Sequence, residues 1–200
     1  MSDDKCGIYY SKGNISDVDT IANFLQQQGV SLEDPKTQKI LAIDLKGDRY
    51  ETNLAQIEQR ILAHKFALIE VWLQSHSDSI WSIEFKDDCW VHEFGFYYLD
   101  NEEIDKLSHI AFKLFTENVL SKNPPLGMYI DRYGRVDDYD FDPFFVKNEG
   151  RIECFTDLIC VPEEKLSRVD IDSATDTVRW LDNGMVCASN DSAFLEELLS

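Results

Sequence analysis

The sequence predicts a single α+β domain, residues 1–200, built on an antiparallel-rich mixed β-sheet with helices packed mainly on one face. Three apolar runs, at residues 66–74, 79–85 and 89–99, alternate their side chains with a period of two, which is typical of strands. The links between these runs are too short for a crossover helix, so neighbouring runs must be antiparallel. Helical patterns before and after the runs supply the layer that covers the sheet.

The chain before the three runs alternates strands with helices. We expect strands at 7–10 and 39–45 and helices at 16–28 and 53–64. Ser16 is suited to cap the first of these helices, and Gly29 to end it. Asn53 with Gln56 can form the cap of the second helix.

The three runs also define the predicted core face of the sheet, because one side of each run is heavily apolar. The expected core-facing residues are Ala67, Ile69, Val71, Leu73, Trp81, Ile83, Phe85, Trp90, His92, Phe94, Phe96 and Tyr98. A helix at 102–122 should cover them, with Asp100 and Glu103 as a capping box at its start. A lone histidine on such a face, here His92, is more often a satisfied core residue than a ligand.

The last third of the chain is expected to add strands to the same sheet. A subdivision into a helix and sheet core at 1–122 and a β-rich extension at 123–200 is the alternative to one undivided domain. The expected elements are strands at 128–133, 152–161, 177–182 and 185–189 and a helix at 192–199. Asn183-Gly184 predicts a type I′ hairpin between the last two strands.

The face opposite the predicted core carries acids together with aromatic residues. Glu70 lies inside an otherwise apolar run, so its pKa should be raised unless it is paired. If Asp87-Asp88 is a two-residue turn, Glu84 and Glu93 become diagonal neighbours on paired strands. This face is either a solvated surface with scattered acids or a groove that binds a ligand, in which case a small-molecule or metal-dependent enzyme is the alternative function. The residues of this alternative ligand face are Glu70, Glu84, Glu93, Trp72 and Tyr97.

The charge of the chain limits its partners. Thirty-eight acids stand against 19 Lys and Arg residues, which gives a formal net charge of −19. Such a charge repels nucleic acid and anionic membranes and attracts basic protein surfaces. We therefore expect a basic protein partner, no nucleic acid and no membrane. A homodimer that forms through a sheet edge, or through the sheet face that carries the aromatic residues, is a further alternative.

The five cysteines are odd in number and show no CxxC spacing. This pattern indicates free thiols in a reducing compartment, and hence a cytoplasmic protein. The acidic start of the chain does not have the pattern of a signal peptide, and no apolar run reaches membrane-spanning length.

Residues 131–145 combine acids with aromatic residues more densely than any other segment. The acids at 138, 140, 142 and 149 follow the spacing of an EF-hand, but Pro143 stands where that loop needs glycine. The segment is either an extended stretch with aromatic residues turned to the core or a surface for a basic partner. The partner-binding residues predicted on the second interpretation are Asp137, Asp138, Asp140, Asp142, Tyr133, Tyr139 and Phe144.

The sequence contains no nucleophile-elbow, phosphate-loop or dinucleotide motif, and no histidine spacing of a zinc site. We therefore expect no catalytic residues, no metal and no cofactor. In composition the chain resembles the broad class of bacterial immunity proteins, which are small, acidic and neutralise toxin domains. The hypothesis that follows is a non-enzymatic, acidic binding protein that docks on a basic protein surface. An immunity-type inhibitor is one form that such a protein would take.

Overall fold

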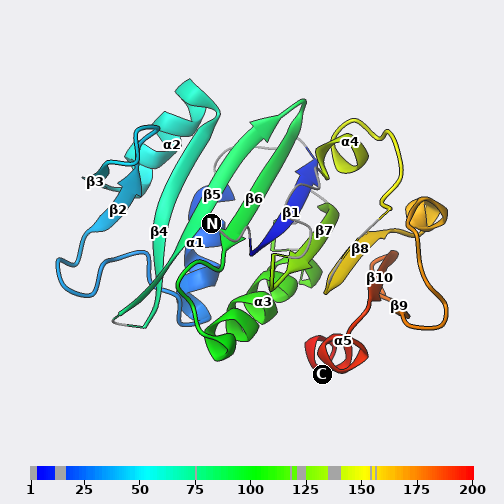
Figure 1. Ribbon diagram of the computed structural model, residues 1–200. Coiled ribbons are helices and arrows are strands. Elements are labelled where there is room, and N and C mark those ends of the chain that lie inside the picture. Colours follow the sequence, from blue (N-terminus) through cyan, green and yellow to red (C-terminus); the bar gives the residue numbers. More distant parts are fainter. Residues whose placement is uncertain are drawn as a thin grey trace.

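The computed structural model describes residues 4–11, 17–74, 76–117, 119–120, 125–134, 141–153, 155 and 157–200 (Figure 1). The strands are β1 (Lys5–Ser11), β2 (Ile40–Ile43), β3 (Arg49–Thr52), β4 (Phe66–Gln74), β5 (Ser77–Lys86), β6 (Cys89–Gly95), β7 (Pro125–Asp131), β8 (Leu158–Pro162), β9 (Thr177–Trp180) and β10 (Met185–Ser189). The helices are α1 (Asp17–Gln27), α2 (Leu54–His64), α3 (Asn101–Thr116), α4 (Asp142–Phe145), the 3-10 helix η1 (Glu163–Arg168) and α5 (Ser192–Leu198).

All ten of these strands belong to one sheet, in the order β3-β2-β4-β5-β6-β1-β7-β8-β10-β9. Every neighbouring pair in this order is antiparallel. The predicted α+β class is therefore confirmed, and strands from both halves of the chain lie in the same sheet. Among the described helices, none is both long and apolar enough to cross a membrane.

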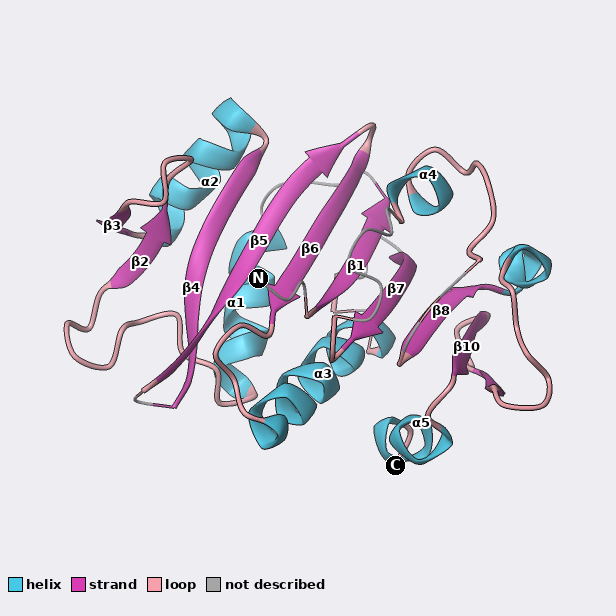
Figure 2. Ribbon diagram, viewed as in Figure 1, coloured by secondary structure: helices cyan, strands magenta, loops and turns pink. Residues whose placement is uncertain are grey.

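The main core lies on one face of the sheet, under α1, α2, α3 and α5. Ile21, Ile57, Leu107 and Leu195 enter it from these four helices. Figure 2 shows α1 and α3 behind the strands. The predicted core-facing residues of β4, β5 and β6 are buried here, except that Phe85 is only partly buried.

A second core covers part of the opposite face, over β1, β7 and β8. It joins Tyr9 and Tyr129 of the sheet to Phe141, Phe144 and Phe145, which belong to α4 or precede it. Tyr129 stacks on Phe141 with ring centroids 4.3 Å apart. The helices are thus mainly on one face, as predicted, and the short helices α4 and η1 are the exceptions, since Leu166 of η1 also packs against the second core.

Local sequence signals place several boundaries correctly. Asp100 and Glu103 form the predicted capping box of α3, and the Asn53 side chain accepts a hydrogen bond from the Gln56 backbone. Asp87 and Asp88 both have positive φ, so the β5–β6 hairpin has the predicted two-residue turn. The cap predicted at Ser16 lies outside the described residues.

Other boundaries differ from the prediction. Helix α3 ends at Thr116 instead of residue 122, β3 was not predicted, and the expected strand 152–161 begins only at Leu158. The last hairpin has a three-residue loop, because the Leu181 backbone N–H donates to the Met185 carbonyl. Tyr98 is not in the core: β6 ends before it, and its side chain is 91% exposed.

His92 is the satisfied core histidine that the sequence predicted. It lies in the sheet beside Trp81, whose indole N–H donates to Nδ1 at 3.3 Å. Burial lowers the pKa of His92 to about 3, so its ring is neutral at physiological pH.

The prediction of free thiols is wrong for two of the cysteines. Cys160 of β8 and Cys187 of β10 are directly opposite each other, with Cα atoms 4.1 Å apart, and form a disulfide. Sequence spacing missed this bond because the two residues become neighbours only through the pairing of β8 with β10. Cys6 and Cys89 are free and buried, and Cys154 lies outside the described residues.

Candidate functional site

Half of one sheet face has no helix over it among the described residues. This surface, which we call the open face, is the side of β2, β4 and β5 turned away from the main core. In the view of Figure 2, β4 and β5 lie in front with no described helix before them. Its six apolar side chains are all partly exposed and belong to neither core: Leu41, Ile43, Phe66, Leu68, Trp72 and Ile80. These exposed apolar side chains make the open face the candidate site.

A buried carboxylate lies in the middle of the open face. Glu70 is 0% exposed, and Arg49 Nε is 2.5 Å from its Oε1 atom. The same guanidinium reaches Asp78 Oδ2 at 3.3 Å, so one cation serves two carboxylates. The Oε2 atom of Glu70 has no hydrogen-bond donor in the described structure, and the buried Nε1 of Trp72 has no acceptor there.

Burial raises the pKa of Glu70 even though the carboxylate is paired with Arg49. The Arg49 guanidinium opposes this shift, while Asp78 adds to it. Because Glu70 lies between β2 and β5 in the sheet, the side chains of both neighbouring strands remove water from it. The group therefore binds its proton more tightly in the folded protein than in the unfolded chain.

We expect Glu70→Gln to stabilise the free protein at neutral pH. A raised carboxyl pKa means that the folded state loses stability as the pH rises from the ordinary value of 4.5 through the raised value, and the amide removes that loss. Thermal melts of both proteins from pH 4 to pH 8 would measure the difference. The gain should shrink as the pH falls toward the ordinary glutamate pKa; an equal difference at every pH would contradict this explanation.

The other two glutamates of the predicted ligand face have separate partners. Glu84 pairs with Lys86 at 3.0 Å, and Glu93 accepts a 2.6 Å hydrogen bond from the Tyr129 hydroxyl. The register places Glu84 opposite Val91 and Glu93 opposite Ser82, so these two are diagonal neighbours as predicted. Glu70 is opposite Ile80 and does not join them.

Gly7 makes the contact between Tyr129 and Glu93 possible. Gly7 of β1 lies between Glu93 of β6 and Tyr129 of β7 in the register, and the tyrosine ring crosses the glycine to reach the carboxylate. A Cβ at position 7 would overlap this ring.

Gly7→Ala is therefore expected to destabilise the protein by about 1–3 kcal/mol, the usual cost of overpacking. Urea denaturation would measure it. The cost should become smaller in a Tyr129→Leu background, where the ring is absent. An equal cost in both backgrounds would mean that the overlap is not the cause.

Tyr97, the last member of the ligand face, lies beyond β6. Its half-exposed ring lies against Gly95, where an added Cβ would overlap it. It follows the end of the strand and is not part of the paired surface that carries Glu84 and Glu93.

Four of the predicted partner-binding residues, Asp137, Asp138, Asp140 and Tyr139, lie outside the described residues. Asp142 accepts hydrogen bonds from the Tyr9 hydroxyl at 2.9 Å and from Lys86 at 2.8 Å, and so joins α4 to the sheet. Phe144 is 2% exposed in the second core, and a ring buried in this way would have to move to enter an interface. Tyr133 is partly exposed beside the Arg132 guanidinium.

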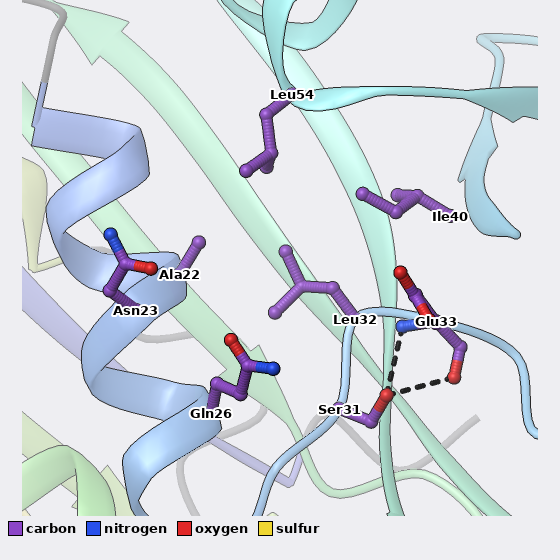
Figure 3. A pocket seen from close by; sticks show the side chains of 8 residues that line it. All are labelled: Ala22, Asn23, Gln26, Ser31, Leu32, Glu33, Ile40 and Leu54. Atoms are coloured by element: carbon purple, nitrogen blue, oxygen red, sulfur yellow. Dashed lines mark hydrogen bonds between the residues drawn. The ribbon is translucent and has the colours of Figure 1, made fainter. Parts of the chain in front are cut away.

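A shallow pocket of about 130 Å³, open to solvent, lies on the other side of the sheet from the open face (Figure 3). Its floor is apolar, and the α1 residues Asn23 and Gln26 contribute amides to its rim. The Ser31 hydroxyl is occupied by the backbone of Glu33, as the dashed lines in Figure 3 show. The lining residues are Ala22, Asn23, Gln26, Ser31, Leu32, Glu33, Ile40 and Leu54.

A buried ionic cluster around Arg132 was not predicted. The guanidinium contacts Asp105 of α3 at 3.0 Å, Asp157 at 3.1 Å and Asp191, the N-cap of α5, at 2.8 Å. It also lies 3.6 Å from the centre of the Phe194 ring. These contacts join three segments that are distant in the sequence, so the cluster stabilises the fold.

Within the described part of the chain, no three His, Cys, Asp or Glu side chains are grouped as a metal site. The open face combines the buried Glu70 carboxylate, which shares Arg49 with Asp78, with partly exposed apolar side chains, and it is the candidate site. Comparison with known proteins finds no matching family model, no similar curated protein and no similar solved structure.

Proposed function

We propose that this chain is a non-enzymatic, acidic binding protein that docks on a basic surface of another protein through its open face. The observation that carries the proposal is the set of six partly exposed apolar residues around buried Glu70, outside both cores. An immunity-type inhibitor in the cytoplasm is the form of binding protein that its composition favours.

The chemistry of the open face suits a protein partner. Its apolar side chains come from two adjacent strands and from β2, so they form a continuous surface rather than isolated contacts. The net charge of −19 would speed encounter with a basic partner, and the aromatic rings of Phe66 and Trp72 are of the kind that anchors interfaces.

The glutamates of this face favour binding over acid–base catalysis. A pair of catalytic carboxylates must face a common space in which the substrate lies. Here Glu70, Glu84 and Glu93 each turn to a different cation or hydroxyl. The enzyme alternative therefore has no pair of carboxylates that share one space.

The test is affinity capture at low salt with the wild-type protein and two matched variants. Leu68→Lys places a cation in the open face, and Leu62→Lys makes the same change on α2, where the leucine is 57% exposed. We expect one basic partner to bind the wild type and the Leu62 variant, to be released by salt, and to bind the Leu68 variant at least tenfold more weakly. Equal binding of that partner by both variants would overturn the proposal.

A further variant tests the acidic segment within residues 131–145, which the sequence predicts as a surface for a basic partner. It changes Asp137, Asp138 and Asp140 to lysine and leaves Asp142 unchanged, because Asp142 holds Lys86 and Tyr9. If this variant alone loses the partner, the docking surface is the segment and not the open face. Thermal melts of all variants would show that each one is folded.

A further inference from the structure

The ion cluster of the open face has one cation too few. Among the described residues, Arg49 is the one cation paired with Glu70 and Asp78, and these three groups together carry a net charge of −1 when both acids are ionised. Its centre is buried: Glu70 is fully covered, Arg49 Nε contacts only its Oε1 atom, and Oε2 has no hydrogen-bond donor in the described structure. A buried carboxylate without its full set of donors is costly, and an added cation would remove that cost.

The groups around Glu70 are suited to bind a guanidinium. Trp72 lies two residues further along β4, on the same face, and Asp78 is opposite Trp72 in the register. An indole ring and two carboxylates are the partners that a guanidinium prefers, because it stacks on aromatic faces and pairs with carboxylates through several N–H groups.

We propose that Glu70, Trp72 and Asp78 form a recognition site for an arginine side chain of the partner; this inference depends on the function proposed above. The incoming guanidinium pairs with Glu70 and makes the cluster neutral, with two cations and two carboxylates. Arg49 is 60% exposed on the edge strand β3, so it can turn toward Asp78 and uncover Glu70 without disturbing either core.

The probe is the peptide acetyl-Leu-Arg-Leu-amide, compared with the same peptide carrying citrulline, the uncharged isostere of arginine. Binding is followed by the indole N–H signal of Trp72 in a ¹⁵N-labelled sample, identified among the four tryptophans by Trp72→Phe. We expect the arginine peptide to shift this signal, with at least tenfold weaker binding for the citrulline peptide. Glu70→Gln should weaken arginine binding by a similar factor.

Glu84→Gln is the matched control, since Glu84 is on the same face but pairs with Lys86. It should bind the arginine peptide as the wild type does. Equal shifts by both peptides, no shift by either, or full binding by the Glu70 variant would each overturn the arginine site. These outcomes are distinct from failure of the docking proposal, which is decided by capture of the partner with the Leu68 and Leu62 variants.

Discussion

Arg132→Met is expected to lower the free energy of unfolding by about 3–5 kcal/mol, because it leaves the buried carboxylate of Asp157 without its cation. Arg132 is itself buried and holds Asp105, Asp157 and Asp191 at 2.8–3.1 Å. Methionine is unbranched and replaces the aliphatic stem of the arginine, so little of the measured loss comes from a cavity; the loss includes the contact of the guanidinium with the Phe194 ring.

Urea denaturation of the wild type and the Arg132 variant measures this loss. The matched control is Arg179→Met, which removes an exposed ion pair with Glu196 and should cost at most about 1 kcal/mol. Domains of this size are stable by about 5–15 kcal/mol, so the Arg132 variant should show a much lower midpoint. Similar losses in the two variants would mean that the cluster is not compensating buried charge.

Removing the disulfide should have the second large effect. Cys160 and Cys187 are separated by 27 residues, and closing a loop of this length stabilises the folded state by about 3–4 kcal/mol on the chain-entropy model. We expect the double variant Cys160→Ala/Cys187→Ala to unfold at lower urea concentration than the oxidised wild type. Reductant should lower the stability of the wild type and leave that of the double variant unchanged.

Alkylation in denaturant gives an independent check of the disulfide. Of the five cysteines, two should be protected in the wild type until a reductant is added. If all five react without reductant, the bond is absent from the protein as isolated. The cytoplasmic prediction depended on free thiols, so this experiment also bears on the compartment in which the chain works.

Local signals predicted the fold better than they predicted its sites. The capping box at Asp100 and the turn at Asp87-Asp88 each depend on residues close in sequence, and both are confirmed. Glu70 was singled out by its apolar neighbours within one strand, and burial raises its pKa although it is paired with Arg49. Its partner Arg49 was missed because β3 has only four residues and no clear alternation.

The Arg132 cluster shows a second limit of sequence reasoning. Its acids lie up to 59 residues from Arg132 in the sequence, and its members include a residue at a strand end, a helix residue and a helix cap. A sequence offers no pairing rule for such a set until the packing of α3 and α5 on the sheet is known. Asp137, Asp138 and Asp140 lie outside the described residues, so the capture experiment is the test of their predicted role in partner binding.

The position of β1 has a consequence for how the chain folds. It is the first strand in sequence, yet it lies sixth in the sheet, between β6 and β7. The five strands before it in the sheet come from residues 40–95 and the four after it from residues 125–189, so two half-sheets can form with their inner edges unpaired. The joining strand must make contacts with both at long sequence separation, which predicts slow folding. Until it does, the exposed edges of β6 and β7 are where the nascent protein is most open to aggregation.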